Sequence, residues 1–305
     1  MNIAKLLHEQ ELLITRLNKL LHGSIEIREA NEKKYIYVHF REDGILQTKY
    51  AGEYSIELYN LILENNKIAK DYKKQLRTIK KELGNVQYES FELNDRIKLN
   101  IDFARKNLVE SIYKQAKLEG VATTFSDTET IVNGGKVKDM TASDISKVVN
   151  LKHAWEFILG EGVITYPTNF VIASQINEIV EEGFSYTAGK LRTVPVRIGG
   201  STYLPPLPFE AKVKEDLENI LSATDSYDTA IELLLYVMKN QLFIDGNKRT
   251  AVIFANHYLI SRGLGLIVIP AELVDDFKKV LIEYYENSDT KIKDFLRNNC
   301  LLKLN

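Results

Sequence analysis

The sequence predicts a mainly α-helical protein in two parts. The first is an N-terminal helical hairpin arm with a short antiparallel β-meander, and the second is a larger helical core with a small β-hairpin. Apolar residues recur every three or four positions over most of the chain, which is typical of amphipathic helices. In two short passages the pattern is instead typical of β-strands, and each of these passages contains a tight-turn signal. The length of 305 residues also fits two folding units.

The arm is expected to span residues 1–84 and to contain two paired helices. The first helix ends near Gly23, and its apolar residues share one face: Leu6, Leu13, Leu17 and Leu20. The second helix is interrupted only at Asn65, and its apolar stripe consists of Leu58, Ile62, Ala69, Tyr72, Leu76, Ile79 and Leu83. Because heptad-like seams pack against each other, we expect an antiparallel coiled hairpin.

Between these helices the sequence changes to a strand pattern. Ile25 and Ile27 alternate with charged residues, and residues 35–40 are β-branched or aromatic almost throughout. Asp43 and Gly44 form a strong turn signal before another extended run. The sequence therefore predicts a three-stranded meander at the tip of the helical arm.

The second arm helix is locally basic, with cations at Lys67, Lys70, Lys73, Lys74, Arg77, Lys80 and Lys81. The favoured interpretation of such a run is a solvated face, and the alternative is a surface for nucleic acid or an acidic partner. The formal net charge of −2 gives the whole chain no general attraction to nucleic acid or anionic lipid. We therefore expect no nucleic acid partner, and a homodimer or a protein partner could use the arm instead.

The larger part of the chain is expected to be a helical core over residues 91–300, after a boundary at residues 84–90 where the helical stripe breaks. One helix is predicted to contain residues 97–116 and to end at Glu119 and Gly120. Further helices are predicted over residues 169–182, 209–221, 228–240 and 246–262. The β-like passage of this half runs through residues 194–204 around a Gly-Gly turn, which predicts a hairpin.

Cysteine usage and hydropathy restrict the compartment. Cys300 is the single cysteine, which excludes an intramolecular disulfide framework and fits a reducing environment. Residues 1–10 reach charged side chains too soon for a signal peptide, and no apolar run is long enough to span a bilayer. We therefore expect a cytoplasmic protein without a membrane partner.

The segment with the clearest chemistry is the link between two apolar helices at residues 240–251. The start of a helix exposes unpaired backbone N–H groups and a partial positive charge, so it attracts anions. Here Gly246 allows close approach of a ligand, Asn247 adds a donor, and Lys248 and Arg249 neutralise charge, which suits a polyphosphate. Asp245 could hold Mg²⁺ beside such a ligand. The alternative is an Asp-Gly turn that starts a helix with two surface cations.

This segment resembles a known family signature. Residues 241–249, Gln-Leu-Phe-Ile-Asp-Gly-Asn-Lys-Arg, match the Fic/Doc motif His-x-Phe-x-(Asp/Glu)-Gly-Asn-(Gly/Lys)-Arg except at the first position. Residues 191–206 resemble the hairpin flap that precedes this motif in Fic proteins. Residues 115–120 are similar to the inhibitory helix of members that carry this element N-terminal to the core. The three elements occur in family order, which implies a Fic fold.

The resemblance implies a function for the motif loop. Most family members transfer AMP from ATP to a protein hydroxyl, and Doc-type members transfer phosphate. Phe243 would anchor the loop in the core, and Asp245 would coordinate Mg²⁺. Gly246 and Asn247 would form the phosphate cradle, and Arg249 would contact nucleotide phosphate. ATP and Mg²⁺ are therefore the expected ligands.

The resemblance also implies roles outside the loop. Glu119 would occupy the inhibitory position, where its carboxylate competes for a motif arginine and displaces the γ-phosphate. The flap would hold an extended segment of a target protein by β-augmentation, with target contacts from Val194, Val196 and Ile198.

The chain departs from the family pattern at several positions. Gln241 stands where the family has its catalytic histidine, and an amide cannot act as a general base. Val252 stands where many AMP-transferring members have a second arginine. Lys248 stands where other members have glycine, and Doc-like loops have lysine there too. Residue Gln115 replaces the Ser or Thr that begins the inhibitory signature. His257 cannot replace the base, because it lies about 12 Å along the helix from Arg249.

Two hypotheses therefore remain. In the first, the protein is a Fic-type nucleotidyl or phosphoryl transferase, impaired by Gln241 and restrained by Glu119. In the second, it is a catalytically inactive module that binds nucleotide and serves regulation or interaction.

Overall fold

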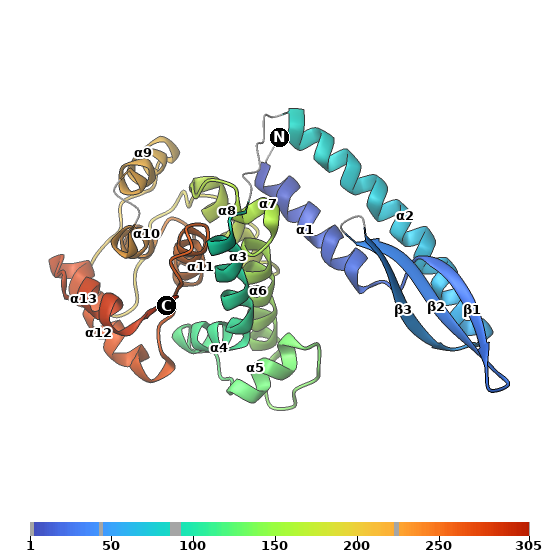
Figure 1. Cartoon of the computed structure of the whole chain (residues 1–305). Coiled ribbons are helices and arrows are strands. Elements are labelled where there is room, and N and C mark those ends of the chain that lie inside the picture. The colour runs from blue at the N-terminus through green and yellow to red at the C-terminus, as the bar shows by residue number, and fades with distance from the viewer. Residues whose placement is uncertain (1–2, 43–44, 86–92, 223–225, 305) are drawn as a thin grey trace. The chain divides into compact units, whose positions relative to one another are not determined.

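A computed structural model describes residues 3–42, 45–85, 93–222 and 226–304 (Figure 1). The chain divides into two compact units, Met1–Glu89 and Ser90–Asn305. The predicted domain boundary falls mostly on residues 86–92, which lie outside the described residues.

The first unit consists of two helices and one antiparallel sheet in the order β1-β2-β3, so the predicted meander is confirmed. Its elements are α1 (Ile3–Lys19), β1 (Ser24–Ala30), β2 (Lys33–Glu42), β3 (Ile45–Glu53) and α2 (Ile56–Asn85). The predicted turn at residues 43 and 44 lies outside the described residues.

The core of the first unit lies between β2 and α2. Ile36 and Val38 point from one face of β2 onto Ile62 of α2, and all three side chains are fully buried. Asn65, which interrupts the apolar stripe of α2, donates its side-chain N–H to the carbonyl of Leu21 at 3.1 Å. This polar residue therefore fastens α2 to the chain that follows α1.

The regular structure of the second unit is almost entirely helical. Its helices before the flap are α3 (Asp95–Lys106), α4 (Leu108–Leu118), α5 (Phe125–Val132), α6 (Ala142–Ile158), α7 (Glu161–Ile164) and α8 (Phe170–Val180). Those after it are α9 (Glu210–Leu221), α10 (Tyr227–Asn240), α11 (Asn247–Ile260), α12 (Val274–Asn287) and α13 (Lys291–Asn299), with a short 3₁₀ turn at Ala271–Leu273. The strands β4 (Leu266–Ile267) and β5 (Leu301–Leu302) pair antiparallel.

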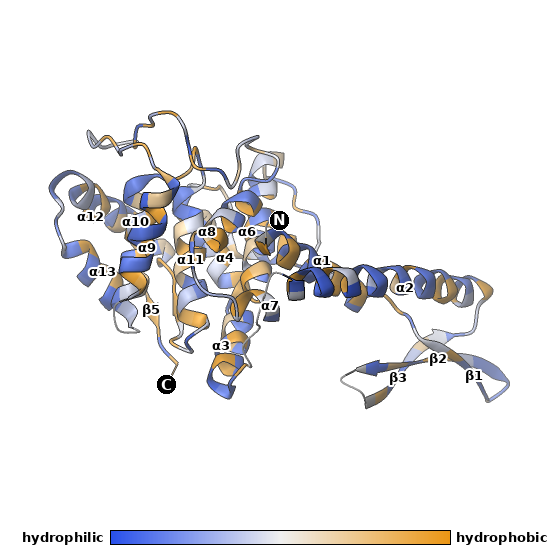
Figure 2. Ribbon diagram, turned by 90° about the horizontal axis from the view of Figure 1, so that it is seen from above, coloured by the Kyte–Doolittle hydropathy of each residue, from blue (hydrophilic) through white to orange (hydrophobic). Residues whose placement is uncertain are grey.

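The core of the second unit is built around α11, which packs against α3, α6, α8 and α10. Its side chains are buried at nearly every position, and Figure 2 shows hydrophobic residues along it. A helix that is buried on all sides is stable only when other elements surround it. The start of α11 is therefore a rigid platform for the loop that precedes it.

The predicted helices around this platform agree with the structure to within two residues at each end, as α8, α9, α10 and α11. The single helix predicted through residues 97–116 is wrong, because the chain breaks at Asn107 into α3 and α4. The Asn107 side chain donates to the carbonyl of Phe103 at 2.8 Å. An asparagine that satisfies helix-end carbonyls in this way favours a helix boundary over continuation.

The mainly helical fold class is confirmed. In the described residues, no helix has both the length and the apolar character that crossing a bilayer requires. Cys300 is buried at the end of α13, and burial raises the pKa of its thiol to about 12.

Candidate functional site

The loop between α10 and α11 is held by two residues in left-handed backbone conformation. Gln241 ends α10 with φ 45°, and Gly246 precedes α11 with φ 72°. A Cβ atom at position 246 would lie 2.6 Å from Oε1 of Glu181. Glycine is therefore required at this position both for backbone conformation and for space.

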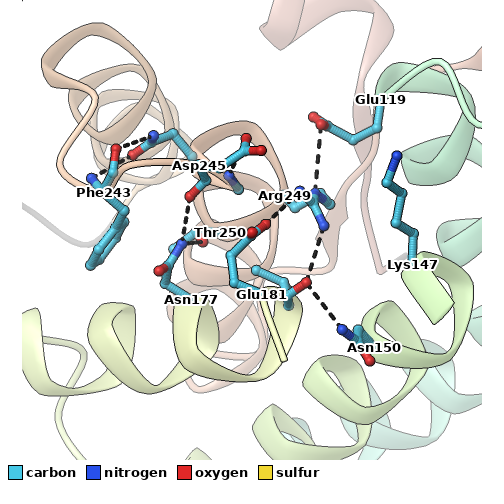
Figure 3. Close-up of polar contacts among 12 residues, drawn as sticks. Glu119, Lys147, Asn150, Asn177, Glu181, Phe243, Asp245, Arg249 and Thr250 are labelled. Carbon is cyan, nitrogen blue, oxygen red and sulfur yellow. Dashed lines mark hydrogen bonds and ion pairs between the residues drawn. The ribbon is translucent and has the colours of Figure 1, made fainter. Parts of the chain in front are cut away.

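Asn247 closes the loop from inside. Its Oδ1 accepts the backbone N–H of Phe243 at 3.0 Å, and its Nδ2 donates to the carbonyl of Phe243 at 2.8 Å (Figure 3). Nδ2 also donates to Oε1 of Gln241 at 3.2 Å. Phe243 is 1% exposed and lies in the core beneath the loop. The Asn247 amide is thus engaged within the loop, so a phosphate cradle would use the backbone N–H groups here.

Gln241 is turned back onto its own helix. Its Nε2 donates to the carbonyl of Met238 at 2.6 Å, and its Oε1 is the acceptor for Asn247. The side chain at the family histidine position therefore ends α10 and supports the loop, and its amide group offers no proton acceptor of useful basicity.

Helix α8 supports the loop from the other side. The side chain of Asn177 donates to the carbonyl of Asp245 at 2.9 Å and to Oγ1 of Thr250 at 3.1 Å (Figure 3). Asp245 itself is exposed, and one oxygen of its carboxylate accepts the backbone N–H of Gly246 at 2.7 Å.

Glu119, at the end of α4, contacts the start of α11. One oxygen of its carboxylate lies 3.5 Å from Nε of Arg249 (Figure 3). The other oxygen lies 3.6 Å from Nζ of Lys248. The Glu119 side chain is 13% exposed, and the Arg249 side chain is 4% exposed. The Glu119 carboxylate therefore lies against Lys248 and Arg249, the two cations that the sequence analysis expects to neutralise a bound phosphate.

Glu181 is a second carboxylate at this site, and the sequence analysis did not identify it. It follows α8, and its Oε1 accepts from Nη2 of Arg249 at 2.5 Å (Figure 3). Nη1 of Arg249 donates to the carbonyl of Val180 at 3.0 Å. Burial raises the pKa of Glu181 to about 6, and nearby Asp245 and Glu119 act in the same direction against the attraction of Arg249.

The site contains more carboxylates than cations. Glu119, Glu181 and Asp245 surround Lys248 and Arg249. Within the described part of the chain, Nε of Arg249 and Oε1 of Glu119 are buried without a hydrogen-bond partner. The described residues also contain no cluster of three or more His, Cys, Asp or Glu side chains suited to a metal. Asp245 could hold Mg²⁺ together with oxygen ligands from a bound phosphate and from water.

Gln115 fastens α4 to the base of the site. Its Nε2 donates to the carbonyl of Arg249 at 2.8 Å, and its Oε1 accepts the indole N–H of Trp155 at 3.0 Å. Gln115 is 2% exposed. The departure from the family pattern at this position is thus a buried polar link that positions the helix carrying Glu119.

The flap segment, residues 191–206, is attached to the end of α10 by one arginine. Buried Arg192 donates from its guanidinium to the carbonyls of Asn240, Gln241, Val194, Pro205 and Pro206. Its backbone N–H donates to the carbonyl of Leu242 at 3.0 Å. This arginine was not identified from the sequence, although it binds the flap to the motif loop.

The flap turns back at the predicted Gly-Gly position, where the N–H of Ser201 donates to the carbonyl of Ile198 at 3.2 Å. No ladder of backbone hydrogen bonds joins its two limbs in the described residues, so this hairpin lacks paired strands of its own. Val194 is exposed, and Val196 and Ile198 are partly buried. The carbonyls of Val194 and Ile198 accept from Arg192 and Ser201, and the intervening backbone groups of the first limb form no backbone hydrogen bond in the described residues, so they suit an added strand.

His257 lies away from this chemistry, as the sequence indicates. It is fully buried, with Nε2 2.9 Å from the carbonyl of Val163 and Nδ1 2.9 Å from Oγ1 of Thr168. Burial lowers its pKa to about 4. It is a packed core residue and does not supply the missing base.

These observations define a class of protein: a helical domain whose core loop presents cations at a helix start, beside a carboxylate from an upstream helix. Residues 169–259 match the Fic/DOC family, and this segment contains α8, the flap and the motif loop. Part of the second unit therefore resembles a Fic domain, and the solved structures with a similar fold are Fic domain proteins. No curated protein matches the chain.

Solved structures share the fold. Fic-1 from C. elegans (residues 134–508) is similar with 15% identity and a TM-score of 0.52, over 79% of this chain and 76% of that one. A Fic domain containing signaling protein from Bacteroides thetaiotaomicron has 18% identity and a TM-score of 0.54, over 65% of this chain and 79% of its own. At these identities the likeness establishes the fold alone.

Proposed function

We propose that the Fic domain binds ATP with its phosphates at the start of α11 and is held in a closed state by Glu119. The observation that supports this most strongly is the position of the Glu119 carboxylate, which contacts both Lys248 and Arg249. An anion at the start of a helix is favoured by the free N–H groups and the helix dipole. A triphosphate would use the same attraction and would displace the carboxylate. Asp245 would hold Mg²⁺, which would supply positive charge to neutralise the phosphates.

The proposed chemistry is transfer of AMP, or of phosphate, to a hydroxyl of a target protein. In AMP transfer the hydroxyl oxygen bonds to the α-phosphorus, the bond from this phosphorus to the oxygen that bridges to the β-phosphate breaks, and pyrophosphate leaves. In phosphate transfer the hydroxyl oxygen bonds to the γ-phosphorus, the bond from this phosphorus to the oxygen that bridges to the β-phosphate breaks, and ADP leaves. In both reactions the hydroxyl proton passes to solvent. The flap limb around Val194 would position an extended target segment. Gln241 cannot take the hydroxyl proton, and general base catalysis typically contributes about 10²–10⁴-fold. We therefore propose slow transfer that depends on positioning and charge neutralisation.

The test compares Glu119→Gln with the matched variant Glu110→Gln, which removes an exposed carboxylate from the same helix. ATP binding should be at least about 10-fold tighter for Glu119→Gln, since one repelling charge is worth about 1.4 kcal/mol or more at a largely buried site. Glu110→Gln should bind as the unchanged chain does. If neither the unchanged chain nor Glu119→Gln binds ATP, the proposed nucleotide site is wrong.

Incubation with ATP labelled at the α- or γ-phosphate distinguishes AMP transfer from phosphate transfer. Label on the protein itself or on lysate proteins from the α-phosphate supports AMP transfer, and label from the γ-phosphate alone supports phosphate transfer. If Glu119→Gln transfers neither label, the enzymatic hypothesis fails and ATP binding remains a separate result.

An inactive nucleotide-binding module is a second candidate, and the folded-back side chain of Gln241 favours it. Histidine tolerates left-handed backbone better than most residues, so Gln241→His fits the φ of 45° at this position. If Gln241 is the only defect, Gln241→His in the Glu119→Gln background should create transfer that is absent without it. Transfer by the unchanged chain with no gain from this substitution would contradict the inactive-module hypothesis.

A further inference from the structure

A groove in the first unit lies between one end of the sheet and α2, which pack side by side (Figure 1). It has a volume of about 1190 Å³ and combines two kinds of lining side chain. The cations are Arg41, Lys70, Lys73, Lys74 and Arg77. The apolar lining includes Ile25, Phe40, Leu46 and Leu63. Among the described residues the lining has one carboxylate, Asp71, so the groove is both positive and apolar.

A second cavity, of about 320 Å³, continues this groove. The two share four lining residues, among them Phe40 and Arg41. The smaller cavity is also lined by Leu17, Leu20 and Leu21, at the end of α1 and just after it, and by Lys49 of β3. It therefore has the same mixture of apolar and cationic side chains. We call the two cavities together the arm groove.

The α2 cations of the arm groove form no ion pair with any described residue. From Lys67 to Lys81 the helix has seven cations and a single acid, Asp71, so it lacks opposite charges one turn away. Helix α9 differs in this respect, because Lys214 pairs there with Glu210 at 2.7 Å. The arm groove therefore presents positive charge that a ligand can neutralise.

These cations follow α2 turn by turn. Lys70, the pair Lys73 and Lys74, and Arg77 lie on successive turns, which are about 5.4 Å apart along the axis. A second helix that lies along α2 has the same pitch. Carboxylates spaced three or four residues apart on such a helix would meet the cations in register, as flanking charges do in paired helices.

Exposed aliphatic side chains share the groove with the cations. Leu63 of α2 is 41% exposed and Leu46 of β3 is 62% exposed, and both belong to the lining. Covering them with apolar side chains of a ligand is favourable, because it removes apolar surface from water. Phosphate and sugar groups offer no such cover. The groove therefore fits a ligand that carries apolar groups beside its negative charges.

The walls of the arm groove are fixed to each other. Oδ1 of Asn66 in α2 accepts the backbone N–H of Gly23 at 2.7 Å, and its Nδ2 donates to the carbonyl of Gly23 at 2.9 Å. Gly23 has φ 144°, and a Cβ there would lie 2.3 Å from the carbonyl oxygen of His39. All three residues line the groove. The groove is therefore formed before a ligand enters, which reduces the entropic cost of binding.

We propose that the arm groove binds an acidic amphipathic helix of a partner protein. Carboxylates on the flanks of this helix pair with the cations of α2 and with Arg41, and its apolar face covers Leu46 and Leu63. Amphipathic helices commonly bind by laying an apolar face into a groove of this kind. The charge complementarity determines that the flanks are acidic.

For the basic run of α2, the sequence favoured a solvated face and left nucleic acid or an acidic partner as alternatives. The aliphatic lining favours the acidic partner, because a nucleic acid would meet the cations and leave the leucines uncovered. A bilayer surface is flat and would not enter a groove between a sheet and a helix. The proposal does not depend on the nucleotide site of the second unit.

The experiment measures binding of the full chain, by fluorescence anisotropy, to a labelled 15-residue peptide with leucine along one helical face and glutamate on both flanks. A second peptide has the same composition, in an order that scatters the leucines around the helix. We expect a Kd below about 100 μM for the first peptide at 50 mM salt, and at least about 10-fold weaker binding of the second. Equal binding of the two peptides would show general charge attraction and would overturn the proposal.

Two lysine pairs of α2 provide a matched test of the charges. Lys73 and Lys74 line the arm groove, whereas Lys80 and Lys81, seven residues further along the helix, do not. The double variant Lys73→Gln and Lys74→Gln should weaken binding of the first peptide at least about 5-fold, and Lys80→Gln with Lys81→Gln less than about 2-fold. Equal effects of the two double variants would overturn the assignment to the groove.

Two leucines of α2 provide a matched test of the apolar contact. Leu63 lines the groove, whereas Leu61, which is 50% exposed, does not. Leu63→Gln should weaken binding at least about 5-fold and Leu61→Gln less than about 2-fold. Glutamine suits a helix about as well as leucine and all the substituted side chains are exposed, so circular dichroism melts should match that of the unchanged chain. No effect of Leu63→Gln would overturn the proposed apolar contact.

Competitors separate the classes of partner. A 20-nucleotide oligothymidylate and phosphatidylserine vesicles should each displace the labelled peptide less well than the unlabelled peptide does at equal negative charge. The proposal is overturned if either competitor is as effective as the peptide, or if the unchanged chain does not bind the first peptide at 50 mM salt. It is also overturned if the chain dimerises in solution and the peptide dissociates the dimer, because a second copy would then occupy the groove.

Discussion

Replacing Gln115 by methionine should loosen the contact between α4 and α11. The Gln115 amide accepts the indole N–H of Trp155 at 3.0 Å and donates to the carbonyl of Arg249 at 2.8 Å. Methionine is similar in length and volume but can do neither. The substitution therefore leaves the buried indole N–H unpaired while creating little cavity.

The magnitude follows from these contacts. A buried donor that loses its partner costs about 1–3 kcal/mol, and Trp155 is fully buried. Losing the hydrogen bond to the carbonyl of Arg249 costs less stability, because a helical carbonyl also accepts a hydrogen bond within its own helix. For a domain the size of the second unit, each kcal/mol shifts the melting temperature by about 2–4 °C. For a central loss of about 2 kcal/mol in the free energy of unfolding, we expect the melting temperature to decrease by about 4–8 °C.

Tryptophan fluorescence measures this change selectively, because Trp155 is the single tryptophan of the chain and lies in the second unit. Unfolding in urea should shift to lower denaturant, and native emission should change as the indole loses its hydrogen bond. Lys117→Met, at a partly exposed site of the same helix, is the matched control. If Gln115→Met and Lys117→Met unfold at the same urea concentration, Gln115 does not fasten α4 to α11.

Three further outcomes are expected. The pKa of Glu181 is raised from its ordinary value of 4.5 to about 6, so the native state holds this proton more tightly than the unfolded chain does. Its contribution to the free energy of unfolding is therefore greatest below about pH 4.5 and falls by about 2 kcal/mol as the pH rises through 6. Urea unfolding of Glu181→Gln, measured from pH 4 to 8, should lack this decline. Gly246→Ala should destabilise the domain more than Gly183→Ala. Both glycines have positive φ, but only a Cβ at position 246 would lie against Glu181. Equal urea midpoints of the two variants would contradict this steric argument. Arg192→Lys should increase hydrogen exchange across residues 191–206, because an ammonium cannot reach five carbonyls, and unchanged exchange would show that the flap is held otherwise.

The parts of the fold that the sequence predicts well are those set by local pattern. The period of apolar residues locates α8, α10 and α11 because each must bury a face along its whole length. The break at Asn107 was missed because the apolar period of residues 97–116 continues through it. The extended passage at residues 194–204 is predicted as a hairpin, and the structure shows its turn but no paired strands in the described residues. Pairing could not be predicted from the local pattern, because the flap is bound to the end of α10 by Arg192, a contact between distant residues.

The charges of the site could be predicted only in part. Lys248 and Arg249 follow from their place at a helix start, and Glu119 followed from the family resemblance. Glu181 is 68 residues from Arg249 in the sequence, and no local period connects them. A signal did exist in the chain, because Glu181 ends a strongly apolar helix where an acidic side chain is expensive to bury without a partner. The sequence does not say which cation that partner is.

The two carboxylates at Arg249 differ in a way that determines how the site can open. Glu181 is 2% exposed and 2.5 Å from the guanidinium, whereas Glu119 is 13% exposed and 3.5 Å from it. If Glu119 moves away, Arg249 keeps Glu181 as a counter-ion, so the departure leaves no uncompensated buried charge. If Glu181 is removed, the buried guanidinium keeps the carbonyl of Val180 and the longer contact with Glu119 but loses its nearest counter-ion, and breaking a buried pair typically costs about 3–5 kcal/mol. Glu181 is therefore the counter-ion that stays with Arg249, and Glu119 is the carboxylate that an incoming anion can replace.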